Sequence, residues 1–144
     1  MNNVLASVIL FYPGKSSLPK QIRFTSPVHG ATPGGISYIQ GHVEILHQGT
    51  WGTICDDNMN DGAATVLCRM AGYSNGGMYS SAYKQPSARR ADKIWLDDLT
   101  CKGSESHVDN CRHRPWGSNN CGHDEDIGIR CITEKGMEYN KRLI

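Results

Sequence analysis

The chain has 144 residues, six of them cysteine, and a formal net charge of +1 at pH 7. This length favours one domain, and the near-neutral charge excludes a general electrostatic attraction to nucleic acid or to a membrane surface. Apolar residues make up 38% and charged residues 20%, which is enough for a modest packed core. No apolar run is long enough to cross a bilayer, so we expect no membrane insertion by this chain.

Residues 1–20 are predicted to be a leader or linker in front of the folded domain. The apolar run Val4–Tyr12 is compatible with the hydrophobic part of a signal peptide, but residues 1–3 carry no lysine or arginine. A linker is the equal alternative. The domain is expected over residues 21–132, and residues 133–144 form a polar tail that is disordered or leads to another domain.

The first half of the domain is expected to hold a short strand, a loop and a hairpin. Residues 21–24 predict the short strand, and residues 27–35, with two prolines and three glycines, predict the loop. The alternation over residues 42–46 and the segment 50–55 predict two strands joined by a turn at Gln48-Gly49. Trp51 and Trp95 lie on predicted strands and are expected in the core.

The second half is expected to be dominated by loops around one helix. Helical spacing over residues 61–71, a cap at Asn60 or Asp61 and a following Gly72 predict that helix. Residues 73–91 predict a long irregular loop, 94–96 a strand, 104–111 a second short helix capped by Ser104, and 127–132 a closing strand. The result is a small α+β fold with short twisted antiparallel strands around one main helix.

The six cysteines indicate a disulfide framework. They lie at positions 55, 68, 101, 111, 121 and 131, and an even, compactly spaced set is typical of small extracellular domains. Structural zinc sites have cysteines two to four residues apart, whereas the closest pair here is ten apart, so we expect no zinc. Disulfides form in oxidising compartments, which predicts a secreted or cell-surface location. The sequence alone leaves fifteen pairings open.

An ordered series of motifs resembles scavenger receptor cysteine-rich (SRCR) domains. The resemblance covers roughly residues 22–132. The loop between Phe24 and Gly41 is longer than in the family, Met59 replaces a usual aromatic residue, and residues 82–93 lack the usual glycines. The motifs are Gly41–Ile45, Trp51–Asp57, Cys68–Tyr73, Ile94–Cys101, Gly103–Ser106, Cys111–His113, Trp116-Gly117 and Asn120–Gly128.

The resemblance implies a disulfide pairing and a class of function. Six cysteines are similar to the group A version of the family, which implies the bridges Cys55–Cys121, Cys68–Cys131 and Cys101–Cys111. It also implies an extracellular ligand-binding module rather than an enzyme. No Gly-x-Ser-x-Gly elbow, His-Glu-x-x-His or phosphate loop occurs, and paired cysteines would leave no thiol nucleophile.

Adjacent aspartates suggest a cation site. Carboxylate oxygens are the preferred ligands of Ca²⁺ and Mg²⁺, and the resemblance implies a site made by Asp56, Asp57 and Glu105. Asp97 and Asp98 are weaker candidates. The alternative is a solvated acidic edge. A weakly held Ca²⁺ or Mg²⁺ with open positions would accept an oxygen from an anionic ligand.

Basic residues and one tryptophan suggest a contact surface for anions. The arginine fork matches sulfate, phosphate and carboxylate groups, although an exposed loop kept soluble by its charges is the alternative. Nothing in these residues shows the interleaved stacking pattern of a nucleic-acid binder. The candidate ligand-binding residues are Arg89, Arg90, Lys93, Arg112, Arg114 and Trp116.

Two hypotheses of function follow, with a third behind them. The first is a scavenger or innate-immune receptor module that binds polyanionic or microbial-surface ligands with help from a cation, within a multivalent parent protein. The second is a protein–protein adhesion or structural module. The third is an accessory domain of an extracellular enzyme.

Overall fold

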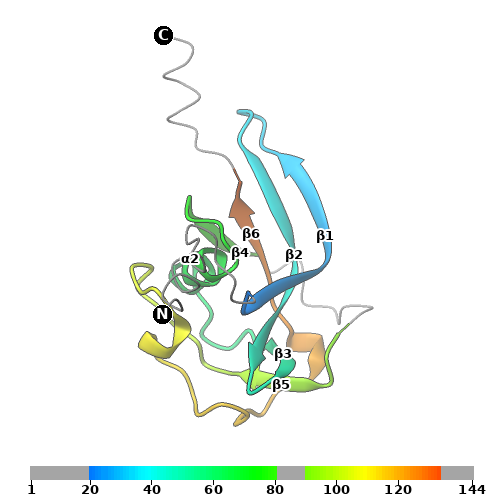
Figure 1. Ribbon diagram of the computed structural model, residues 1–144, viewed down its shortest axis with the longest axis vertical. Coiled ribbons are helices and arrows are strands. Elements are labelled where there is room, and N and C mark those ends of the chain that lie inside the picture. The colour runs from blue at the N-terminus through cyan, green and yellow to red at the C-terminus, as the bar shows by residue number, and fades with distance from the viewer. Residues whose placement is uncertain (1–19, 81–89, 134–144) are drawn as a thin grey trace, which may run out of the picture.

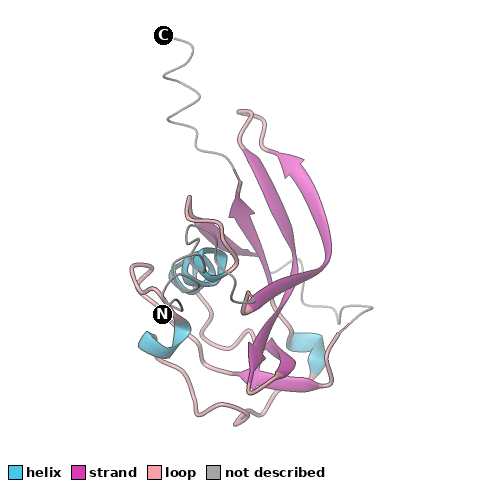
Figure 2. Cartoon of the chain, viewed as in Figure 1, coloured by secondary structure: helices cyan, strands magenta, loops and turns pink. Residues whose placement is uncertain are grey.

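The computed structural model describes residues 20–80 and 90–133. Six strands form one curled sheet in the order β4-β6-β2-β3-β5, with β1 paired to β2, and helix α2 covers one face beside β4 and β6 (Figures 1 and 2). The elements are β1 Ile22–Ala31, β2 Ser37–His47, β3 Thr50–Ile54, α2 Asp61–Met70, β4 Gly77–Ser80, β5 Lys93–Leu96, the 3₁₀ helices η2 Val108–Asn110 and η3 His123–Glu125, and β6 Gly128–Ile132.

The predicted hairpin and main helix are both confirmed. Gln48 and Gly49 have φ values of 50° and 78°, the left-handed pair that a tight turn between right-twisted strands requires. Asn60 caps α2 by accepting a hydrogen bond from the Ala63 N–H at 2.8 Å, and Gly72, with φ of 100°, follows its last turn. Local signals were sufficient at these three places because each turn or cap needs a particular residue type.

The first strand is longer than the sequence predicted. Residues 27–31 continue β1 instead of forming a loop, because Pro27 lies at an irregularity in the pairing between Thr25 and Val28. A bulge accommodates proline without removing a ladder hydrogen bond. The strand therefore resumes at Val28 and extends the β1–β2 hairpin beyond the rest of the sheet (Figure 1).

Three further expectations are corrected. Strand β4 lies inside the stretch predicted to be an irregular loop, where β6 on one side supplies its partners. Strands β3 and β5 pair in parallel rather than antiparallel. The second short helix is also reduced to η2, which is capped by His107 rather than Ser104, and its Val108 is fully buried.

The three implied disulfides are confirmed. Cys68–Cys131 ties α2 to β6, Cys55–Cys121 ties the end of β3 to the segment before η3, and Cys101–Cys111 closes a short loop. The two long bridges span 66 and 63 positions and contribute roughly 4 kcal/mol each on the chain-entropy model.

The core is built from the sheet's inner face and α2. Its largest fully buried apolar side chains are Ile22, Val43, Ile45, Ile54, Val66, Leu67, Leu96, Leu99, Val108, Ile127 and Ile129.

Candidate functional site

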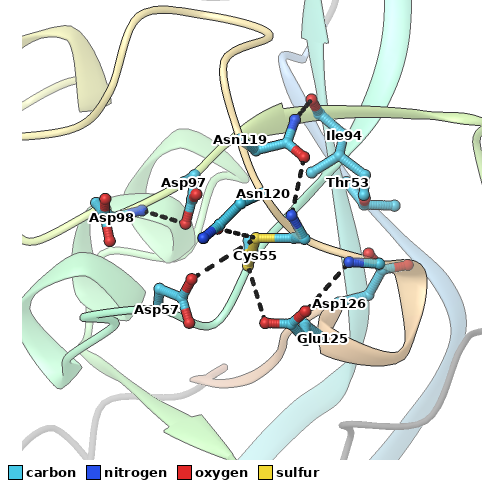
Figure 3. The surroundings of a disulfide bond; sticks show 12 residues. Thr53, Cys55, Asp57, Ile94, Asp97, Asp98, Asn119, Asn120, Glu125 and Asp126 are labelled. Atoms are coloured by element: carbon cyan, nitrogen blue, oxygen red, sulfur yellow. Dashed lines mark hydrogen bonds between the residues drawn. A yellow bond between two sulfur atoms is a disulfide. The ribbon is translucent and has the colours of Figure 1, made fainter.

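Acidic residues gather where β3 and β5 end. Because these two strands run parallel, their carboxyl ends lie at the same edge of the sheet. Asp56 and Asp57 follow β3, and Asp97 and Asp98 follow β5. Carboxylate oxygens of Asp57, Asp97 and Asp98 lie within 4.8 Å of one another. Figure 3 shows these three side chains beside the disulfide bond. The parallel pairing thus brings together two aspartate pairs that lie 41 positions apart in the chain.

Asp97 is the buried member of this group. Its side chain is fully buried, and its Oδ1 accepts a hydrogen bond from the Asp98 N–H at 2.8 Å. Its Oδ2 is also buried but has no hydrogen-bond partner among the described residues. Buried polar atoms nearly always have a partner, so an oxygen without one, beside two further carboxylates, is well suited to a cation.

Asp57 and Glu125 lie on either side of the Cys55–Cys121 bridge. The Asp57 Oδ2 lies 3.8 Å from the Cys121 sulfur, and the Glu125 Oε1 lies 3.7 Å from the Cys55 sulfur. These two cysteines are oxidised and provide no thiolate ligand. Glu125 therefore approaches the aspartates through the disulfide, a contact between distant segments that the sequence analysis did not identify.

The pKa of the Asp57 carboxyl reflects the crowding of negative charge around it. Desolvation raises the pKa of its carboxyl, and repulsion from Asp97, Glu125, Asp56 and Asp98 raises the same pKa further. A bound cation would relieve this repulsion, which is a physical reason for the cluster to bind one.

Glu105 does not join this cluster. Its carboxylate accepts hydrogen bonds from the backbone N–H groups of Lys102 and Gly103, at 2.9 Å each. Hydrogen bonding from Lys102 is the main cause that lowers the pKa of Glu105. Both oxygens are thus used to hold the loop closed by Cys101–Cys111, and the glutamate near Asp57 is Glu125.

Two of the predicted basic residues lie beside the acidic cluster. Arg112 and Arg114 line an open hollow of about 580 Å³ that also includes Asp98. Backbone hydrogen bonds fix the segment that carries both arginines. Thr100 and Arg112 pair with each other, and the Arg114 N–H donates to the Asp97 carbonyl at 3.0 Å. A ligand in this hollow can contact guanidinium groups and the edge of the acidic cluster together.

The other predicted contact residues are elsewhere. Trp116 is half-buried and stacks on His47, with ring centroids 3.9 Å apart. Lys93 lies over the ring of Trp95 at 4.8 Å, and Arg90 lines a separate hollow beside β1. Arg89 lies outside the described residues. Trp95 is in the core as predicted, whereas Trp51 is half-buried beneath Arg23.

The pair formed by His123 and Asp126 has a structural role. The His123 Nδ1 lies 2.9 Å from the buried Asp126 carboxylate, and its Nε2 lies 2.9 Å from the Asp92 carbonyl oxygen. Burial raises the pKa of Asp126, while hydrogen bonds from Thr53 and His123 act in the opposite direction. Because both ring nitrogens have protein partners, His123 ties η3 to the backbone just before β5 and to Asp126.

The chain belongs to the SRCR family: the model of the scavenger receptor cysteine-rich domain matches residues 33–132. Macrophage receptor MARCO of Mesocricetus auratus is 46% identical over 92 residues, which is 64% of this chain and 18% of that protein. Lysyl oxidase homolog 4 of Homo sapiens is 41% identical over 100 residues, which is 69% of this chain and 13% of that protein. The chain therefore spans less than a fifth of either relative.

A solved structure supports the same assignment. The dimeric form of the SRCR domain of mouse MARCO matches with a TM-score of 0.57 and 41% identity, over 65% of this chain and 87% of that chain. The chain thus carries a receptor-like extracellular module of a family found both in macrophage scavenger receptors and in lysyl oxidase homologues. In the described part, no helix has the length and apolar character needed to span a bilayer.

Proposed function

We propose that this domain binds polyanionic ligands of cell or microbial surfaces in the hollow beside Asp98, with help from Ca²⁺ or Mg²⁺. The observation that carries the cation site is the buried Oδ2 of Asp97, which has no hydrogen-bond partner in the described part of the chain. Asp57 and Asp98 supply the neighbouring oxygens. Asp56 and Glu125 add negative charge that favours a cation electrostatically.

The ligand would be held by two kinds of contact. A cation bound by a few carboxylates keeps water in its remaining positions, and an anionic oxygen of the ligand can replace one of these waters. Arg112 and Arg114 line the same hollow and offer bidentate hydrogen bonds to sulfate or carboxylate groups. Each contact is weak, so useful avidity requires several domains in one parent protein.

Calorimetric titration of Ca²⁺ and Mg²⁺ into the oxidised, chelator-treated chain tests the cation site. We expect saturable binding that is abolished by Asp57→Asn and by Asp97→Asn and weakened by Glu125→Gln. Glu105→Gln is the matched control, because its carboxylate holds a separate loop, and it should bind as the wild type does. Equal loss in Glu105→Gln and Glu125→Gln, or no binding at millimolar cation, contradicts the site.

Binding to immobilised heparin tests the ligand class. We expect retention that falls when chelator is added and falls again in Arg112→Gln and Arg114→Gln. If retention does not change with chelator but is lost in the arginine variants, the arginines bind the anion without help from a cation.

An accessory role in an extracellular enzyme is the second candidate. It is favoured by the identity of 41% to lysyl oxidase homolog 4, in which a region similar to this chain makes up only 13% of the protein. In that case the catalytic group lies in another domain and this module binds ligands for it. Full-length sequencing of the gene distinguishes the two architectures.

A further inference from the structure

The outer face of the sheet, opposite α2, is apolar around one arginine. The exposed large apolar residues of the described part are Val28, Ile36 and Met78, at 53%, 36% and 46% exposure. Strand register places Val28 and Met78 in one cross-strand row with Gln40 and Arg130. Cross-strand partners lie on the same face of a sheet, so this row crosses β1, β2, β6 and β4.

Arg130 occupies the middle of this row. Its guanidinium lies 3.8 Å from the centroid of the Tyr38 ring, and its Nε donates to the Gln40 Oε1 at 2.9 Å. It lines a hollow of about 280 Å³ with six neighbours, none of which is acidic: Thr32, Ile36, Tyr38, Gly77, Met78 and Ile132. We call this surface the Arg130 face.

Arg23, elsewhere on the outer side of the sheet, has a carboxylate partner and serves as a comparison for Arg130. Arg23 also stacks on an aromatic ring, that of Trp51 at 4.1 Å, but its guanidinium lies 2.6 Å from the Glu44 carboxylate. Among the described residues, no carboxylate pairs with Arg130. Its terminal nitrogens therefore offer charge-assisted donors to a carboxylate from another molecule.

The adjacent sheet edge is closed to strand addition. The Gly77 carbonyl accepts from the Thr65 hydroxyl at 3.2 Å, and the Tyr79 N–H donates to the Asp61 carboxylate at 2.9 Å. Side chains of α2 thus cap the backbone groups that a partner strand would need at β4. A molecule that docks here must contact the side chains of the face instead.

We propose that the Arg130 face docks a protein partner through a segment that presents an apolar side chain next to a carboxylate. The apolar group enters the hollow between Ile36, Met78 and Ile132, and the carboxylate pairs with Arg130. Arginine, tyrosine and methionine together, without lysine or acidic residues, are the composition of interface centres. A second copy of this chain fits less well, because a two-fold contact brings two Arg130 cations together.

Nuclear magnetic resonance titration tests this with a defined probe, N-acetyl-leucyl-glutamate, and its neutral analogue N-acetyl-leucyl-glutamine. Chelator is present throughout, so that the cation site does not contribute. We expect saturable amide shifts at Val28, Met78 and Arg130 with the acidic probe, and binding about tenfold or more weaker with the neutral probe. Equal binding of the two probes, or shifts confined to Arg112 and Arg114, overturns the proposal.

Two variants separate docking from folding. Arg130→Gln should lose the preference for the acidic probe, whereas Arg112→Gln, the matched control, should keep it. Met78→Glu places a carboxylate directly opposite Arg130, so it should block the probe while the domain remains folded by circular dichroism. Sedimentation that shows a dimer lost in Arg130→Gln would assign the face to a second copy and overturn the proposal, as would tighter binding of a heparin fragment at the same amides.

Discussion

Two buried carboxylates at different places in the sheet have opposite surroundings. Glu44 in β2 is 1% exposed, and its two oxygens accept from Arg23 at 2.6 Å and from the Ala91 N–H at 2.6 Å. Asp97, just after β5, is equally buried, but one of its oxygens has no hydrogen-bond partner within residues 20–80 and 90–133. Burial of a carboxylate therefore does not by itself indicate function. The state of its hydrogen bonds separates a structural contact from a candidate ligand site.

The largest expected effect is the loss of stability when the buried Glu44 loses its arginine partner. Arg23→Gln leaves the buried Glu44 carboxylate without its cation and should lower the free energy of unfolding by about 3 kcal/mol, measured by urea denaturation of the oxidised domain. Arg112→Gln, which removes an exposed arginine, should change it by less than about 0.5 kcal/mol. Similar small losses in both variants would mean that Glu44 is less dependent on Arg23 than its geometry indicates.

The candidate ligand site should respond to calcium instead. At ten times its dissociation constant, Ca²⁺ should raise the free energy of unfolding of the wild type by about 1.4 kcal/mol. Asp97→Asn should abolish this increase, because the neutral amide is a poorer ligand. Arg23→Gln should be less stable but should retain the full increase. Thermal unfolding of the wild type and the two variants, with and without Ca²⁺, measures this increase. If Ca²⁺ still stabilises Asp97→Asn, our assignment of the site is wrong.

The smallest expected effect is the pH dependence of Asp57 without a cation. Its folded pKa is raised above the ordinary value of 3.8, so its charged form destabilises the fold. In chelator at neutral pH, Asp57→Asn should therefore be more stable than the wild type by less than about 1 kcal/mol. The difference should diminish as the pH falls through the folded pKa and vanish below 3.8. Urea denaturation of both proteins across this range checks the sign.

Local chemistry made much of the fold predictable. The turn at Gln48-Gly49 and the capped helix α2 each depend on residues adjacent in the chain. The disulfide pairing was different, because the cysteine positions alone left it open. It followed from the family resemblance, and the structure confirms it.

Contacts between distant segments were not predictable in the same way. Strand β4 has a weak local pattern and is stabilised by β6 and by Asp61 and Thr65 of α2. The proximity of Glu125 to Asp57 depends on the Cys55–Cys121 bridge, and that of Asp97 on the parallel pairing of β3 with β5. The aspartates themselves could be named from the sequence, but their glutamate neighbour could not.

The positions of the bridges also determine how the domain would respond to mechanical tension. A pulling force that enters at the N-terminal end of the domain reaches Cys55 and then passes through the covalent bridge to Cys121. Residues 56–120 form a loop that this bridge closes, and they include all four aspartates of the acidic cluster and both arginines of the hollow beside it. Stretching can separate β1 from β2, but it cannot pull apart the two ends of the loop that carries most of the candidate site. A module anchored in flowing fluid could therefore keep its ligand contacts while its first hairpin yields.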